Sequence, residues 1–395
     1  MNKNLIALAV AAAVAAPAIA LADNSTVSIY GTLNVDVESV QAKSAAGAGV
    51  NLERRNRVSN NSANIGFRGV EPLGGGVDAW FQIENNVPID SGGGGWSNRN
   101  SAVGLKGSFG NVNLGLWDTP YKFSTGRLDP FGNTSIAAYT GVVGGNVSPL
   151  NTGNAANRAS FDRRQQNFVQ YWSPNLGGFS GRVGYGANEE KNAAACAGIA
   201  CDPQLLSLSL AYENGPIYVT AAYEKHDEYA NTATTKSDDT AWKVGGAFTF
   251  AGSHTVSAMW ERLNFEGSVG TIGLPKTVDP TSTTAANILA GTANEAEMDT
   301  WFVSYLGKFG PHNLRASYGQ NNELEIDGTE QTDTKARFWA LGYGYAWTKR
   351  TELYALYVNI DNDTNSSNTF GVNTLAGAGA GADPRGFGVG VKHTF

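Results

Sequence analysis

The chain has 395 residues, and its 28 lysines and arginines against 35 aspartates and glutamates give a formal net charge of −7, with only 16% of positions charged. That charged fraction is below the roughly 25% usual for soluble domains. An acidic chain with a sequence pI of about 5.2 also lacks the basic field that nucleic acid needs, so no nucleic-acid partner is expected. Glycine is frequent at 49 residues but proline is not at 13, which excludes collagen and low-complexity disorder.

The first 22 residues have the three parts of a secretory signal peptide. Lys3 precedes the apolar run 5–16, and Ala20 and Ala22 complete a cleavage site of the A-x-A type. A transmembrane helix is the alternative, but twelve apolar residues rise only about 18 Å. The hydrocarbon core of a membrane is about 30 Å thick. We therefore expect cleavage between Ala22 and Asp23 and a single mature domain over residues 23–395.

Beyond the signal, short segments alternate between apolar and polar residues, which is the period of a β-strand with one apolar face. No later run offers the 18 apolar residues of a membrane-spanning helix. Sixteen such segments follow one another along the chain: 27–37, 64–68, 77–84, 102–106, 112–116, 168–172, 179–186, 206–212, 217–224, 242–250, 255–262, 300–309, 314–318, 336–347, 352–360 and 386–395.

The connections between these segments alternate in length. Short Gly-, Pro- and Asn-rich turns, such as those at 214–216 and 310–312, alternate with long polar stretches, such as 39–62, 118–160 and 361–384. A soluble β-sandwich would also alternate along each strand. Short turns at one end and long loops at the other are typical of a transmembrane antiparallel β-barrel. We therefore predict an all-β barrel of about 16 strands in the bacterial outer membrane, in contact with outer-membrane lipid.

Several motifs resemble the general porins of Gram-negative bacteria, particularly the beta-proteobacterial type. They are residues 64–76 followed by 79–84, then 103–110, 172–179, and the ending 391–395. The resemblance covers essentially the whole mature chain. It implies a sixteen-stranded homotrimer, a third loop (residues 118–160) folded into the barrel as a constriction, and a final aromatic residue, Phe395, that serves as an assembly signal.

A constriction of this kind places loop charges opposite wall charges across a narrow aqueous passage. Asp118 and Asp129 are the acids of the expected loop. Strand alternation directs four cations inward: Arg68, Lys106, Arg164 and Arg182. The resemblance makes Arg164 and then Arg99 the best wall candidates, whereas Asn64 and Leu116 stand where the family often has further arginines. Ordinary solvated lumen charges without control of selectivity remain the alternative for each of them.

The charge count between Asp118 and Arg164 favours anions by a small margin. The stretch holds Lys122, Arg127, Arg158, Arg163 and Arg164 against Asp118, Asp129 and Asp162. Because salt screens each charge beyond about 8 Å, this local excess should outweigh the negative net charge of the chain. We expect a modest anion preference.

Other residues offer weaker signals. The pair His226 and Asp227 is the only foothold for a barrel-borne hydrolase, and no G-x-S-x-G motif accompanies it; loop histidines in solvent are the simpler interpretation. Cys196 and Cys201 are expected to pair in the oxidising periplasm. No metal site, cofactor or catalytic residue is expected.

The sequence thus predicts a porin that passes small hydrophilic solutes and ions by passive diffusion and is not an enzyme. A channel specific for a sugar or an anion is the alternative. Such a channel would want a row of inward aromatic residues, and Tyr30, Trp80 and Trp172 are too scattered along the sequence to assert one.

Overall fold

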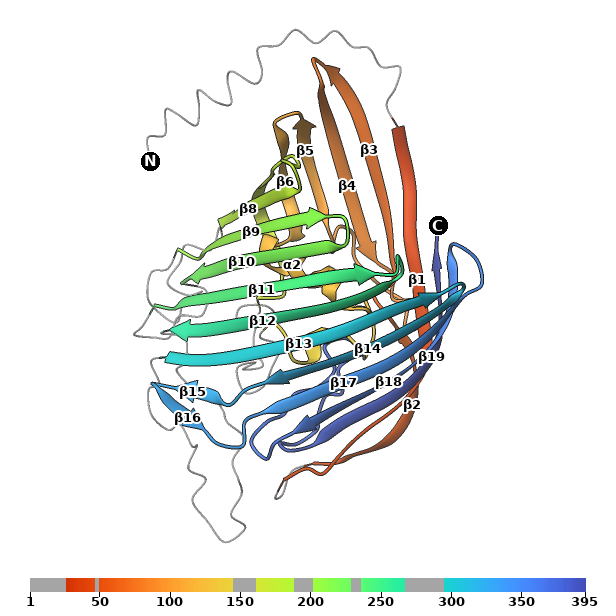
Figure 1. Ribbon diagram of the computed structural model, residues 1–395, viewed down its shortest axis with the longest axis vertical. Coiled ribbons are helices and arrows are strands. Elements are labelled where there is room, and N and C mark those ends of the chain that lie inside the picture. The colour runs from red at the N-terminus through yellow and green to blue at the C-terminus, as the bar shows by residue number, and fades with distance from the viewer. Residues whose placement is uncertain (1–25, 47–49, 145–160, 188–201, 229–235, 267–294) are drawn as a thin grey trace.

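The computed structural model describes residues 26–46, 50–144, 161–187, 202–228, 236–266 and 295–395, which form one antiparallel sheet of nineteen strands (Figure 1). The sheet closes on itself because the first and last strands pair in register from Thr32↔Thr394 to Lys43↔Asp383. The strands are β1 (Thr26–Lys43), β2 (Leu52–Asn60), β3 (Asn64–Gly74), β4 (Val77–Asn86), β5 (Ser101–Gly107), β6 (Gly110–Asp118), β7 (Arg164–Trp172), β8 (Phe179–Ala187), β9 (Gln204–Asn214), β10 (Ile217–Asp227), β11 (Asp238–Phe250), β12 (His254–Glu266), β13 (Glu295–Phe309), β14 (His312–Asn321), β15 (Leu324–Ile326), β16 (Thr329–Gln331), β17 (Ala336–Ala346), β18 (Thr351–Asn362) and β19 (Asp383–Thr394).

These elements make a closed barrel of sixteen strands. β2 and β3 are two halves of one barrel strand, since β1 pairs with β3 through its first residues and with β2 through its later ones. β15 and β16 form a small hairpin in a loop, between β14 and β17, which pair directly with each other. The predicted all-β barrel of about 16 strands is therefore confirmed. One predicted loop is wrong: residues 39–62 are mostly strand, because β1 runs to Lys43 and β2 pairs back onto it.

The short turns gather at one end of the barrel, and their residues explain their tightness. Gly215 and Gly310 each occupy the first central position of a two-residue hairpin turn with φ of +56° and +59°, followed in each case by proline. This is the arrangement of a type II′ turn, where a positive φ favours glycine and the turn matches the twist of the flanking strands. The long connections lie at the opposite end.

The faces of the barrel are inverted relative to a soluble protein. Outward positions carry exposed apolar side chains, such as Val219, Val244, Leu341 and Val389, each at least half exposed. Inward positions of the same strands carry polar residues or pack under the loop that enters the lumen. Such an outer surface suits lipid rather than water, which excludes the soluble sandwich. In the described ranges no helix has the length and hydropathy to cross a membrane.

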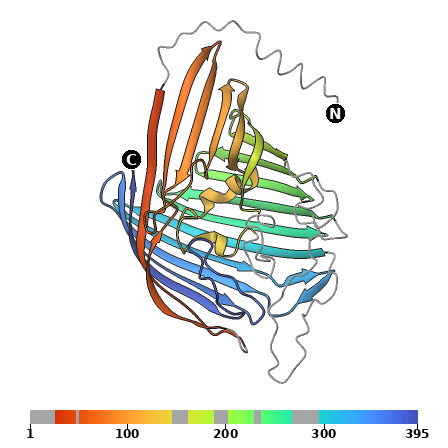
Figure 2. The ribbon, with the colours of Figure 1, turned by 180° about the vertical axis from the view of Figure 1, so that it is seen from behind.

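The segment after β6 turns into the barrel instead of leaving it. Its short helix α2 (Pro120–Thr125) and the 3₁₀ turns η1 (Gly126–Leu128) and η2 (Tyr139–Gly141) lie inside the ring of strands (Figures 1 and 2). Pro120 at the first helical position and the Thr119 hydroxyl, which accepts from the Lys122 N–H, begin α2. Tyr139 and Val142 then pack on Phe302, Phe338 and Ile360 of the inner wall. The largest apolar core thus lies inside the barrel, between loop and wall.

Candidate functional site: the lumen constriction

The inward-folded loop follows the inner wall and is held there by hydrogen bonds from wall side chains. The Tyr218 hydroxyl donates to the Ser124 carbonyl and the Ser304 hydroxyl to the Leu128 carbonyl, both at 2.7 Å. The Asn321 amide donates to the Val142 carbonyl at 2.6 Å. Donors on β10, β13 and β14 therefore satisfy loop carbonyls that would otherwise be buried without a partner.

One ion pair beneath the loop is completely dry. Lys243 Nζ of β11 lies 3.2 Å from Glu261 Oε1 of β12, and both side chains are 0% exposed. The same carboxylate accepts from the Tyr121 hydroxyl at 2.8 Å and from the Gly144 N–H at 2.7 Å. Lys243 also lies 3.8 Å from the centre of the Tyr121 ring. We call Lys243, Glu261, Tyr121 and Gly144 the loop clamp, because Glu261 joins two separate points of the loop, Tyr121 and Gly144, to the wall.

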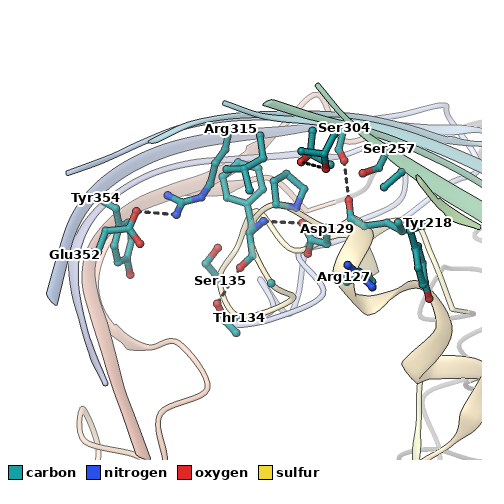
Figure 3. Close-up of a pocket in the computed structure, with 18 of the residues that line it drawn as sticks. Arg127, Asp129, Thr134, Ser135, Tyr218, Ser257, Ser304, Arg315, Glu352 and Tyr354 are labelled. Atoms are coloured by element: carbon teal, nitrogen blue, oxygen red, sulfur yellow. Dashed lines mark hydrogen bonds and ion pairs between the residues drawn. The ribbon is translucent and has the colours of Figure 1, made fainter. Parts of the chain in front are cut away.

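Among the residues that the structure describes, the loop borders two open spaces in the lumen. The larger has a volume of about 790 Å³ and lies between α2, the start of β7 and the strands β8–β10. The smaller, about 360 Å³, lies under residues 127–135 and reaches the walls of β14, β18 and β19 (Figure 3). The two chambers share five lining residues, so they are neighbours: Arg127, Gly132 and Thr134 of the loop, and Glu213 and Tyr218 of the wall strands β9 and β10.

The larger chamber has more cations than acids among the residues that line it. The cations are Arg99, Lys122, Arg127, Arg164 and Arg182, and the acids are Asp118, Asp162 and Glu213. Four of these cations have a carboxylate within 3.4 Å: Arg99 with Glu84, Lys122 with Asp162, Arg127 with Glu213 and Arg164 with Asp118. The smaller chamber is balanced, with Arg127, Arg315 and Lys392 against Asp129, Glu213 and Glu352. The excess positive charge therefore belongs to the larger chamber.

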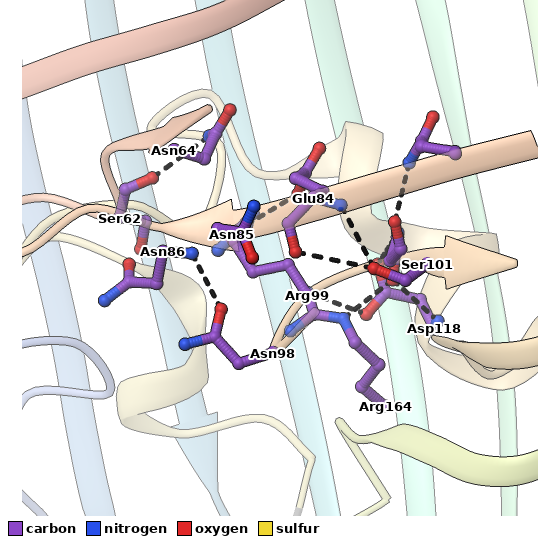
Figure 4. A network of polar contacts seen from close by, with 12 residues as sticks. Ser62, Asn64, Glu84, Asn85, Asn86, Asn98, Arg99, Ser101, Asp118 and Arg164 are labelled. Atoms are coloured by element: carbon purple, nitrogen blue, oxygen red, sulfur yellow. Dashed lines mark hydrogen bonds and ion pairs between the residues drawn. The ribbon is translucent and has the colours of Figure 1, made fainter. Parts of the chain in front are cut away.

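A polar network that includes Glu84, Arg99, Asp118 and Arg164 lies where β6 ends and the loop begins (Figure 4). Asn100 joins two of its members, Asp118 and Arg164. Its amide donates to Asp118 Oδ2 at 2.7 Å, and its oxygen accepts from Arg164 Nε at 2.7 Å. Arg164 Nη2 lies 3.2 Å from Asp118, completing a closed triangle. Burial alone would lower the pKa of Lys122, but the Asp162 and Asp118 carboxylates outweigh it and raise that pKa. Lys122 therefore stays charged.

Asp129 borders the smaller chamber but is almost entirely buried within the loop, although we expected it to face the wall cations across the passage. Its side chain is 4% exposed, and its two oxygens accept from the N–H groups of Phe131, Asn133 and Tyr139 at 2.8–3.2 Å. Burial raises the pKa of this carboxyl to about 6, against the opposite effect of those three N–H donors. Asp129 folds the loop rather than facing the opposite wall.

Arg182 differs from the other lumen cations. Its guanidinium carbon lies 3.3 Å from the centre of the Phe123 ring of α2 and 4.5 Å from that of Trp172. Within the residues that the structure places, no carboxylate approaches it to ion-pair distance. Trp172 in turn meets Trp80 and Trp117, with ring centres 6.0 and 5.4 Å away. Of the three aromatic residues that we judged too scattered, Trp80 and Trp172 are in fact brought together, with Trp117, by the strand register, and Tyr30 is not part of this cluster.

The comparisons with known proteins agree with this geometry. The sequence profile described as Gram-negative porin matches residues 7–365. The chain belongs to the Gram-negative porin family. Outer membrane porin protein 32 of Delftia acidovorans is 28% identical to this porin over the full length of both chains. The major outer membrane protein P.IB of Neisseria meningitidis serogroup B is 31% identical over 58% of this chain and 61% of that relative.

Solved structures place this porin in the same fold. An anion-selective porin from Comamonas acidovorans superposes with a TM-score of 0.73 at 22% identity, covering 94% of this chain and 100% of that one. OmpT of Vibrio cholerae, in its trimer form, gives a TM-score of 0.63 at 18% identity with 94% and 100% coverage. This porin is an outer-membrane channel for the passive diffusion of small hydrophilic solutes and ions. The family points to a channel rather than an enzyme.

Two predicted wall cations lie outside both chambers. Arg68 stacks over Tyr30 at 5.1 Å and donates to Ser28, and Lys106 lies 3.7 Å from Asp78. Neither lines the chambers that the loop creates. The clamp residues Lys243 and Glu261 were missed, although strand alternation could have found them: Trp242 and Val244 on either side of Lys243 face outward.

We expected His226 to be a solvated loop histidine, but the structure shows that it is buried. It lies in β10, is 0% exposed, and sits 2.9 Å from Glu224 while stacking on Phe161 with ring centres 4.3 Å apart. A histidine buried between the loop and the wall cannot contact a solute. His226 therefore gives no support to the hydrolase alternative.

Phe395 ends the chain on the outer face, 41% exposed, with its carbonyl accepting from the Gly31 N–H. Ala22, Asp23, Cys196, Cys201 and residues 145–160 lie outside the part of the chain that the structure describes.

Proposed function

We propose that this porin prefers small anions modestly over cations and that the larger chamber sets the preference. The observation that carries the proposal is the charge of its lining, five cations against three acids. Screening limits each charge to about 8 Å in physiological salt, so the acids on the outer loops have little effect inside. The balanced smaller chamber contributes no preference of its own.

The test is the zero-current potential of the reconstituted channel in a potassium chloride gradient. An anion-selective sign at low ionic strength, weakening as salt rises, is the expected result. A potential of zero, or one of cation-selective sign, would contradict the proposal. The purified protein should also leave peptide and ester substrates uncleaved, since we propose that it catalyses no reaction.

We further propose a homotrimer inserted in outer-membrane lipid, with residues 118–160 as the constriction loop and Phe395 as part of the assembly signal. The trimer form of OmpT of Vibrio cholerae and the exposed Phe395 that directly follows β19 support this. Unheated protein in mild detergent should migrate differently from boiled protein on a gel. Deleting Phe395 should lower the amount of heat-modifiable protein, and an unchanged amount would count against its role.

Processing of the chain is also a proposal. We expect export to remove residues 1–22, so that Asp23 is the first residue of the mature protein, and we expect Cys196 and Cys201 to form a disulfide. Intact mass of the purified protein tests both. A mass that includes residues 1–22, or a protein that takes up two thiol reagents without prior reduction, would contradict the corresponding expectation.

A further inference from the structure

We propose that Arg182 and the three indoles beside it form a binding site for organic carboxylates inside the channel. This site rests on the anion preference proposed above: Arg182 would supply the positive charge, and organic carboxylates would be the preferred anions. A carboxylate group would bind the guanidinium, and the apolar body of the solute would lie against the indole rings.

Among the described residues, Arg182 is the chamber cation that no carboxylate pairs with, whereas each of the other four has a carboxylate partner. Arg127 uses two nitrogens on the two Glu213 oxygens, at 2.7 and 3.0 Å. Arg164 uses Nε on Asn100 and Nη2 on Asp118. For Arg182, across the described ranges, no acceptor engages its N–H groups. An arginine has five N–H donors, so its fork is open to a ligand.

Two aromatic rings hold the guanidinium of Arg182 in place. Phe123 and Trp172 lie 3.3 and 4.5 Å from the guanidinium carbon. These contacts hold the guanidinium between α2 and β7 without using any acceptor for its N–H groups. Two parallel N–H···O bonds from a guanidinium match a carboxylate. Because the side chain is already held, less conformational entropy is lost on binding.

Three indoles form an aromatic surface next to Arg182. Trp80, Trp117 and Trp172 lie on β4, β6 and β7, with ring centres 5.4 to 6.0 Å apart. Gly104 makes room for them, since a Cβ there would lie 2.7 Å from Trp80 Nε1. All three indoles remain partly exposed. An aromatic surface beside a cation favours a solute with a planar apolar body and one negative charge.

Benzoate is the probe, with acetate as the matched solute that lacks the ring. In planar bilayers, benzoate should reduce the potassium chloride current of the wild-type channel in a saturable way, and acetate should do so roughly threefold to tenfold more weakly. R182Q should abolish both effects. W172L should bring benzoate close to acetate, while both still act.

R262Q is the control that removes one positive charge from the outer side of β12, where Arg262 pairs with Asp299; its benzoate response should equal that of the wild type. Heat-modifiable migration confirms that each variant has folded. No saturable effect of benzoate on the wild type, or an equal effect on R182Q, overturns the carboxylate site. The zero-current potential in potassium chloride alone is measured separately, so a wild-type channel without anion preference is recognised as a failure of the proposed function instead.

Discussion

Two cation–carboxylate pairs inside this barrel have similar geometry and opposite surroundings. Lys243 and Glu261 lie 3.2 Å apart, both 0% exposed, beneath the loop. Arg127 and Glu213 lie 2.7 Å apart, with side chains 50% and 54% exposed, between the two chambers. The shorter pair is solvated and screened by salt, whereas the longer one has no water to replace a lost partner. Burial, more than distance, therefore decides which pair holds the loop and which one meets the ions.

The largest effect on stability is expected from removing one partner of the buried pair Lys243 and Glu261. Glu261→Leu leaves Lys243 buried without its carboxylate and also removes the acceptor of the Tyr121 hydroxyl and the Gly144 N–H. Loss of one partner of a buried pair costs about 3–5 kcal/mol. The loop should detach from the wall, so the single-channel conductance should rise and fluctuate, and the temperature at which heat-modifiable migration is lost should fall.

The double variant Lys243→Met with Glu261→Leu is the control for that prediction. It removes both charges, so it should lose less stability than Glu261→Leu alone. A double variant that is as unstable as the single one, or a single variant with wild-type conductance, would show that the buried charge does not hold the loop.

Strand alternation was enough to predict the barrel and the inward position of Arg182, because each strand has one face toward lipid and the period is two. Strand alternation does not predict which way side chains point beyond the irregularity between Gly115 and Trp117. The register between β6 and β7 shifts there, before the pair Asp118 and Arg164. The indole cluster depends on the register between strands β4, β6 and β7, which a single sequence does not contain. The conformation of the loop is even less predictable from the sequence. Asp129 is buried because backbone N–H groups in the turns of the loop donate to its oxygens, and no periodic sequence pattern predicts these turns.

A second prediction concerns pH and the loop itself. Asp129 has a pKa of about 6 when the loop is folded, against an ordinary value of 3.8. A raised pKa means that the folded loop binds the proton more tightly than the unfolded loop. Its contribution to stability is therefore fully present below pH 3.8 and is lost as the pH rises through about 6, a change of about 3 kcal/mol.

Asp129→Asn isolates this contribution from the other carboxylates. The wild-type protein should lose loop stability, seen as noisier single-channel current, between pH 4 and pH 6, with no further loss above pH 7 from this group. The variant should lack that component. Identical pH profiles for the two proteins would show that Asp129 does not titrate in the folded loop over this range.

The smallest effect on stability is expected from the solvated pair of Arg127 and Glu213. Variants of this pair therefore separate an effect on stability from an effect on ion selectivity. Exposed ion pairs contribute at most about 1 kcal/mol, so Glu213→Gln and Arg127→Gln should each leave the heat-modifiable migration nearly unchanged. Their electrostatic effects should be opposite, because Arg127 and Glu213 line both chambers. Removing the acid should move the zero-current potential further toward anions, and removing the cation should move it toward potassium.

Both shifts should shrink as salt rises from 0.1 M to 1 M, since the screening length falls from about 10 Å to about 3 Å. The double variant, which removes one charge of each sign, should lie near the wild type; shifts of the same sign in both single variants would mean that the pair acts by reshaping the loop and not through its charges.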